Sequence, residues 1–96
     1  MRNLSDDQVT RIASRARALG EPTRVRILEV LARGELPVGH IADALSSQPS
    51  TVSKHLQVLF QAGLVQRRRA ASEVIYSISS RKLLEWVRYL SARKLT

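Results

Sequence analysis

Apolar residues along most of this chain recur every three or four positions, which is the spacing of one face of a helix. Four such blocks occupy residues 5–19, 22–33, 40–45 and 49–62, and a fifth begins at residue 80. Residues 64–69 and 73–79 predict two strands, joined at Ala70-Ala71-Ser72. In the second strand, the alternating set is Val74, Tyr76 and Ile78 against Glu73, Ile75 and Ser77. The chain therefore predicts four helices, a hairpin and a last helix.

The residues at the ends of these blocks support the helix assignments. Ser5 and Gln8 have the spacing of a capping box. Pro22 and Pro49 stand at first helical positions, where a missing N–H costs nothing. Ser47 or Gln48 is expected to cap the helix that begins at Pro49. In the second helix, the expected buried face comprises Val25, Leu28, Leu31 and Ala32, with Ile27 and Val30 beside it.

Residues 38–63 combine a short apolar helix, a polar turn and an amphipathic helix, which is the pattern of a helix-turn-helix. One side of the amphipathic helix carries Val52, Leu56, Leu59 and Phe60. The opposite side carries Ser50, Ser53, Lys54, Gln57 and Gln61. That polar side holds a single full charge, whereas a merely solvated face usually carries more Glu and Lys. Its composition therefore favours a surface that reads DNA bases.

A basic hairpin that directly follows such a helix is typical of a wing. The sequence predicts one domain over residues 1–96, mainly α with a small β-hairpin: a winged helix-turn-helix with wing residues at about 64–79. Additional terminal helices are expected at about residues 5–19 and 80–94. The last helix is apolar over more than one face, so we expect it to contact a second chain. The predicted dimer interface comprises Val9, Ile12, Leu84, Trp86, Val87 and Leu90.

The net charge of +8 points to a polyanionic partner, either nucleic acid or an anionic membrane surface. Of the 16 basic residues, 13 are Arg, the side chain best suited to bidentate phosphate and guanine contacts. The membrane reading is weaker, because no segment is long and apolar enough to span a bilayer. The first residues form no apolar signal region, so a cytoplasmic protein is expected.

The chain contains no cysteine, which excludes disulfides and thiolate metal sites. It also shows no nucleophile with a base at a recognisable spacing and no Gly-rich phosphate loop. We therefore expect neither an enzyme nor a bound cofactor.

The residue types on the polar side of the helix suit contacts with double-stranded DNA. Gln48, Ser50 and Thr51 stand at the helix start, where exposed N–H groups favour phosphates. Ser53, Lys54 and Gln57 are expected deeper in the major groove. In that groove Gln is suited to adenine and Lys to guanine.

Arg67, Arg68 and Arg69 are expected to contact phosphates or the minor groove from the wing. Because successive strand residues face opposite sides, Arg68 with one neighbour is a better candidate than all three together. His55 lies at the edge of the apolar side, and a packed or backbone-bonded histidine is the favoured reading there.

Five segments together form a specific combination: Ala18–Leu31, Glu35–Val38, Gln48–Leu59, Ala62–Val65 and Val74–Ile78. In this combination the chain resembles the ArsR/SmtB family of winged-helix repressors over about residues 12–79. The resemblance implies a homodimer built from the first and last helices. It further implies binding to an inverted-repeat operator and repression, with release by a metal ion or another signal.

One departure from that family bears on the signal. Metal-sensing members carry a Cys-x-Cys in the stretch that matches Leu36–Gly39, and this chain has Pro37 and Gly39 there. Other members hold metal on the last helix, where this chain offers Glu85 but no His. The wing also lacks the glycine that many relatives have at its tip. We therefore predict no metal site in the known positions.

Three alternatives stay open at this point. The first is an atypical metal site of Glu35, His40 and Asp43, although scattered ligands are a poor basis for one. The other two are a winged helix that acts as a protein-interaction module and a nonspecific DNA-binding protein. The effector is open too: an organic ligand at the dimer interface and regulation without any ligand both fit the sequence.

Overall fold

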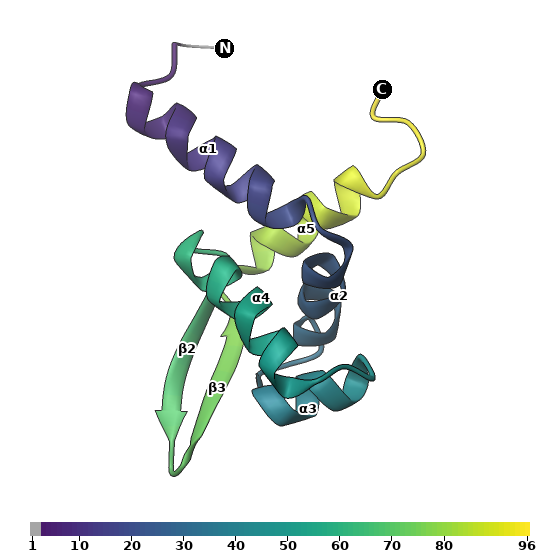
Figure 1. The fold of residues 1–96 in the computed structure, drawn as a ribbon. Helices are drawn as coiled ribbons and strands as arrows, with labels where there is room; N and C mark the ends of the chain where they lie inside the picture. Colours follow the sequence, from purple (N-terminus) through teal and green to yellow (C-terminus); the bar gives the residue numbers. More distant parts are fainter. Residues whose placement is uncertain (1–2) are drawn as a thin grey trace.

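The computed structural model describes residues 3–96, within which the chain forms five helices and three strands (Figure 1). In chain order the elements are α1 (Asp6–Leu19), α2 (Pro22–Leu31), β1 (Leu36–Pro37), α3 (Val38–Ala44), α4 (Pro49–Gln61), β2 (Val65–Ala70), β3 (Glu73–Ile78) and α5 (Arg81–Leu90). The predicted order of helices and hairpin is confirmed. The bounds differ by more than one residue at three ends: α2 ends at Leu31 rather than near residue 33, α3 begins at Val38 rather than His40, and α5 ends at Leu90 rather than near residue 94.

The capping box predicted for the first helix is present. The Ser5 N–H donates to Gln8 Oε1 at 2.8 Å, and the Gln8 N–H donates to Ser5 Oγ at 3.1 Å. Together the two bonds satisfy backbone groups that the start of a helix otherwise leaves unpaired. At α2, Pro22 occupies the start of the helix as expected, and the Glu21 carboxylate accepts from the Arg24 N–H at 3.1 Å.

The sheet has three antiparallel strands in the order β1-β3-β2. The hairpin of β2 and β3 was predicted, but β1 was not. Two residues are too short to show an alternating pattern, and β1 is defined only by its pairing: Leu36 lies opposite Tyr76 and Pro37 opposite Ile75. Pro37 is tolerated because β1 is an edge strand. This short strand joins the connection after α2 to the hairpin.

A single apolar core lies where α2, α3 and α4 meet the sheet. Its largest fully buried side chains are Ile27, Leu28, Ile41, Val52, Leu56, Leu59 and Val65. The buried face predicted for α2 is partly wrong. Ile27 and Val30 are buried with Leu28 and Leu31, whereas Val25 and Ala32 are only half-buried. The reason is that α2 contacts α1, α3, α4 and β3 together, so its buried stripe is turned toward Ile27 and Val30.

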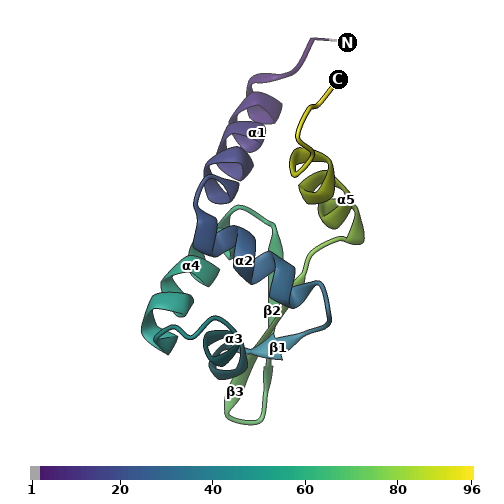
Figure 2. The same cartoon turned by 90° about the vertical axis from the view of Figure 1, so that its right-hand side faces the viewer.

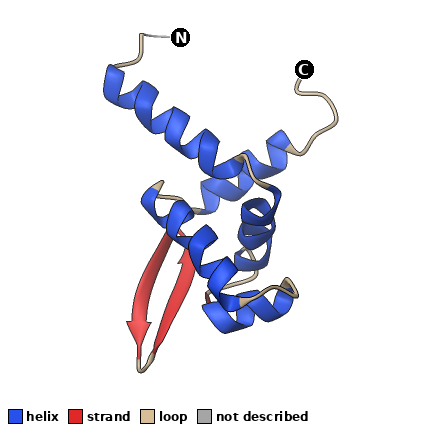
Figure 3. Cartoon of the chain, in the orientation of Figure 1, coloured by secondary structure: helices blue, strands red, loops and turns tan. Residues whose placement is uncertain are grey.

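The two terminal helices stand apart from this core as two arms that extend toward the same end of the molecule (Figure 2). Ala18 is the only buried residue of α1, and α5 has none. The hairpin lies at the opposite end from the chain termini, and strands occur only on that side (Figure 3). The molecule therefore has an end formed by α1 and α5 and an opposite end formed by the hairpin with α3 and α4.

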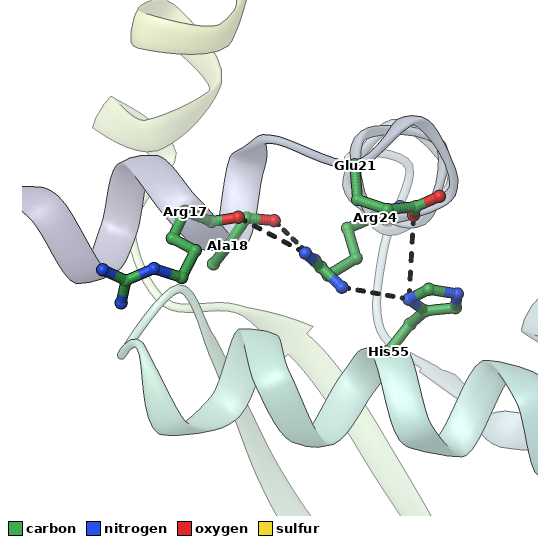
Figure 4. A network of polar contacts seen from close by, with 5 residues as sticks. All are labelled: Arg17, Ala18, Glu21, Arg24 and His55. Carbon is green, nitrogen blue, oxygen red and sulfur yellow. Dashed lines mark hydrogen bonds and ion pairs between the residues drawn. The ribbon is translucent and has the colours of Figure 1, made fainter.

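One guanidinium group joins three of the helices (Figure 4). Arg24 Nε donates to the Ala18 carbonyl at 2.7 Å, and its Nη2 donates to the Arg17 carbonyl at 3.3 Å. The Ala18 carbonyl lies at the end of α1, where helix geometry leaves it without a backbone partner, whereas the Arg17 carbonyl also accepts from the Gly20 N–H at 3.1 Å. A cation at this end of α1 also interacts favourably with the helix dipole. The Arg24 Nη1 reaches His55 Nδ1 on α4 at 3.3 Å. Arg24 thus fixes α4 against the junction of α1 and α2.

His55 is half-buried and belongs to this network. Arg24 Nη1, which can only donate, lies 3.3 Å from His55 Nδ1. The Glu21 carboxylate lies 3.7 Å from the same nitrogen. The predicted structural role for His55 fits this placement, except that its partner is a side chain rather than the backbone.

We expect replacement of Arg24 by Met to lower the free energy of unfolding by about 1–3 kcal/mol, because charge-assisted hydrogen bonds to the Ala18 and Arg17 carbonyls are lost and the Ala18 carbonyl is left without a partner. Urea denaturation at one fixed protein concentration measures the change. Arg26→Met is the matched control on the same helix. Arg26 pairs with Glu29 at 2.9 Å on an exposed surface, so its loss is expected to cost no more than about 0.5 kcal/mol. Equal losses for the two variants would contradict the role given to Arg24.

Candidate nucleic-acid interface

The turn between α3 and α4 presents the start of α4 to solvent. Ser46 takes a positive φ of 51°, and the Ser47 N–H donates to the Ala42 carbonyl at 2.9 Å, which closes the turn. The predicted side-chain cap is wrong. Gln48 is the N-cap residue but its side chain makes no capping bond, and the Ser47 hydroxyl donates instead to the Leu45 carbonyl at 3.2 Å. Within residues 3–96 the first N–H groups of α4 thus have no side-chain partner, which suits them to an anion.

The amphipathic pattern of α4 is realised in the structure. Val52, Leu56 and Leu59 are fully buried, and Phe60 is half-buried at the edge of the core. The side chains predicted to contact DNA are all exposed: Gln48, Ser50, Thr51, Ser53, Lys54 and Gln57. The helix therefore offers hydroxyl, amide and ammonium groups on a surface anchored from below by apolar packing.

The three wing arginines lie in three different environments because β2 alternates. Val65 is buried, and Arg67, two residues further, faces the same way toward α4. Arg67 Nη1 donates to Gln57 Oε1 at 3.2 Å, and its guanidinium carbon lies 3.8 Å from the centre of the Phe60 ring. Arg67 is thus held against the exposed side of α4 rather than directed away from it.

Arg68 points to the other side of the sheet and pairs with Glu35, which precedes β1. Its Nη2 donates to Glu35 Oε1 at 2.6 Å and its Nε to Oε2 at 3.4 Å. The hydrogen bonding donated by Arg68 lowers the pKa of Glu35, and the same interaction raises the pKa of Arg68. Since the carboxyl pKa is lowered, the attraction is present at neutral pH and is lost as the pH falls through that lowered value. A phosphate would have to compete with Glu35 for this arginine.

Arg69 is exposed near the tip of the hairpin, and no hydrogen bond or ion pair joins its side chain to another residue among 3–96. The next turn contains Ala71 at a φ of 56°, the left-handed region that glycine adopts most readily. This conformation explains why a glycine is common at the tip of such a wing. In this chain alanine adopts the same conformation at some cost in strain. Of the three arginines, Arg69 is the one whose guanidinium would bind a phosphate without first leaving another side chain.

The side chains considered for an atypical metal site do not assemble. Glu35 is engaged by Arg68, whereas His40 and Asp43 are exposed on α3. Among the described residues, no three His, Asp or Glu side chains gather closely enough to hold a metal ion.

The terminal helices expose most of the predicted dimer interface. Val9 and Ile12 on α1 are 51% and 54% exposed, and Trp86 and Leu90 on α5 are 61% and 50% exposed. Leu84 is half-buried, and Val87 packs against the protein's own core. The rings of Trp86 and Tyr89 meet edge to face, with centroids 6.2 Å apart.

Over the described residues, no helix is long and apolar enough to cross a membrane.

Several known proteins are similar to this chain in sequence and in fold. Residues 21–67 match the family model for bacterial regulatory proteins of the arsR family. The chain is 39% identical over 75 residues to the HTH-type transcriptional regulator NmtR of Mycobacterium tuberculosis, over 78% of this chain and 62% of NmtR. It is 35% identical over 85 residues to a transcriptional repressor SmtB homologue of Synechocystis, over 88% of this chain and 64% of that protein. The chain thus spans slightly less than two thirds of the length of these two relatives.

Among solved structures, the chain is similar to the homodimeric winged helix-turn-helix DNA-binding domain of Mb0332 from Mycobacterium bovis. The TM-score is 0.82 at 31% identity, over 94% of this chain and 86% of that domain. The predicted fold class is therefore confirmed, and the proteins that the chain matches are transcriptional regulators rather than enzymes. This chain belongs to the ArsR family of bacterial regulatory proteins.

Proposed function

We propose that this protein is a homodimeric transcriptional repressor that binds an inverted-repeat operator in double-stranded DNA. One observation carries the proposal: the exposed polar side of α4 lies next to the arginine-bearing hairpin, at the opposite end of the molecule from the apolar surfaces of α1 and α5. One end is suited to DNA and the other to a second copy of the chain.

In this proposal the start of α4 positions the protein on the DNA backbone. Gln48, Ser50 and Thr51 contact phosphates together with the free N–H groups of the first helical turn. Arg69 adds a phosphate contact from the wing, because its charge is not matched by an acidic side chain among the described residues. These contacts fix orientation and contribute affinity that depends on salt.

Base reading falls to the side chains that follow along the same side of α4, namely Ser53, Lys54 and Gln57. A helix in the major groove brings such side chains to the base edges, where donors and acceptors distinguish all four base pairs. Lys54 offers only donors, which suits the acceptors of guanine.

A second copy would cover the apolar surfaces of the terminal helices. Val9, Ile12, Trp86 and Leu90 supply exposed apolar area on the two arms. The structural neighbour Mb0332 is described as homodimeric, which supports the same assembly here. A two-fold axis between the copies would place two α4 helices in successive major grooves, with half-sites roughly 34 Å apart or a multiple of that distance.

The proposal includes DNA binding without a bound metal. The chain has no cysteine, so the thiolate site of metal-sensing family members cannot form. Glu35 is occupied by Arg68. A chelator should therefore leave DNA binding unchanged.

Selection of bound duplexes from a random pool, at physiological salt and with or without a chelator, tests this function directly. We expect enrichment of an inverted repeat whose half-site centres lie about one DNA turn apart, or a multiple of one turn. The enrichment should survive the chelator. The same selection is made with Lys54→Ala, which should change the selected bases while leaving the fold intact. A pool without any enriched sequence would contradict a specific repressor and indicate nonspecific binding.

Replacement of Arg69 by Ala should weaken binding to the selected site and to unrelated duplexes by the same factor. The slope of log affinity against log salt concentration should fall in magnitude by about one, because one fewer phosphate is neutralised. Fluorescence anisotropy across a salt series measures both quantities. Arg68→Ala should change them less, since Glu35 already matches that charge. A larger effect at Arg68 than at Arg69 would reverse these roles.

Replacement of Trp86 by Glu should break the dimer, because a charge is introduced into the centre of the exposed apolar surface on α5. Sedimentation equilibrium should then give the mass of one chain. Affinity for the inverted repeat should fall roughly 100-fold or more, since only one half-site is engaged at a time. Val58→Glu, at an apolar α4 side chain that is 38% exposed, should leave the mass unchanged. A dimer that persists in the Trp86 variant would exclude α5 from the interface.

A further inference from the structure

We propose that Arg67 sets the base preference of Gln57, so that Gln57 donates to an acceptor on guanine or thymine instead of pairing with adenine. The inference rests on the proposed function, because it concerns how the same α4 surface reads DNA. It departs from the expectation for an unconstrained glutamine, which pairs with adenine through both its amide oxygen and its amide nitrogen.

The chain brings these two side chains together through a tight reversal after α4. Gly63, at a φ of 78°, allows the chain to turn back directly after the helix ends at Gln61. Strand β2 then runs alongside α4, with Val65 buried beneath the helix and Arg67 next along the same side. Gln57 and Phe60 are three residues apart on α4, so their side chains are neighbours where the polar side of the helix meets its apolar side. Arg67 reaches both of them.

The contact fixes which end of the amide faces outward. Arg67 carries five N–H donors and no acceptor, so only the oxygen of Gln57 can face it. The structure has this arrangement, with Arg67 Nη1 at 3.2 Å from Gln57 Oε1. The amide nitrogen and its two N–H donors are therefore turned away from the wing. Gln57 is presented as a donor.

The guanidinium itself is held in place from a second direction. Its central carbon lies 3.8 Å from the centre of the Phe60 ring, within the range of a favourable cation–π contact. Phe60 is half-buried and packs against the core, so the platform is itself fixed. An Arg side chain stays charged at any pH at which the protein is folded. The orientation of Gln57 is therefore set before DNA arrives.

The neighbouring arginines cannot replace Arg67 in this role. Arg68 faces the opposite side of the sheet, where it is paired with Glu35. Arg69 faces the same side as Arg67 but lies one strand repeat further from α4, near the hairpin tip. The pairing is thus specific to one position of the wing.

The charge of Arg67 and the orientation of Gln57 favour the same bases. In the major groove guanine offers two acceptors, N7 and O6, and thymine offers the acceptor O4. Adenine offers one acceptor, N7, but next to it an amino donor, and cytosine offers an amino donor alone. The partial positive charge of these amino groups is disfavoured beside a guanidinium. A donor from Gln57 and a nearby cation both select an acceptor, with guanine preferred because it has two.

The test measures dissociation constants on a panel of duplexes derived from the selected operator. The position read by Gln57 is the one where Gln57→Ala loses base discrimination, and all four base pairs are placed there. For the wild type we expect guanine or thymine to be preferred over adenine by roughly tenfold. Arg67→Leu keeps apolar contact with Phe60 but removes the donor, and it should raise the relative affinity for adenine until that preference is lost.

Two further variants separate orientation from charge. Arg67→Lys keeps a cation but loses the planar group that stacks on Phe60, and it should relax the preference in part. Arg69→Ala should lower affinity without altering the order of bases. A wild type that prefers adenine at this position would overturn the inference, as would an unchanged order of bases in Arg67→Leu or a Gln57→Ala variant that alters no base preference. A wild type that discriminates among no duplexes would overturn the proposed function itself.

Discussion

A single cation, Arg24, links α4 to the junction of α1 and α2. Arg24 binds the last carbonyls of α1 and reaches His55 on α4, while Glu21, at the start of α2, lies beside the same histidine. Apolar packing of Leu56 and Leu59 holds α4 onto the core but is not directional. Hydrogen bonds from a planar guanidinium are directional. Since α1 belongs to the apolar end of the molecule, this contact also relates the dimer surface to the DNA-binding surface.

That relation matters because a dimeric repressor reads two half-sites at once. The separation of the two α4 helices is fixed by how each α4 is oriented relative to the helices at the two-fold axis. In the proposed dimer, a small change in the angle between α1 and α4 would displace both α4 helices from successive grooves. The Arg24 network therefore connects the two ends of the molecule. In the proposed dimer, a movement of α1 would be transmitted through this network to α4.

Local pattern was sufficient for the helices, the hairpin and the exposed side of α4, because each depends on residues close in sequence. The capping box of Ser5 and Gln8 is of this kind. The sequence could not give β1, whose two residues are defined by pairing with β3, or the ion pair of Glu35 with Arg68, which are 33 residues apart. It also misjudged the buried face of α2, because contacts with several other elements decide which side of that helix is covered.

The wing shows that contacts between distant parts of the chain also limit how much of the candidate site the sequence predicts. Three consecutive arginines look equivalent in the sequence, yet strand alternation and the turn at Gly63 give each a different partner. Buried residues such as Val52 and Val65 maintain the fold and are compatible with any protein that has this fold. In the proposed complex with DNA, pairs of surface side chains from different elements determine which bases are recognised. The structural neighbour Mb0332, which is 31% identical, has the same architecture. In the proposed reading of DNA, the base specificity of this chain depends on the pair of Arg67 with Gln57 more than on either side chain alone.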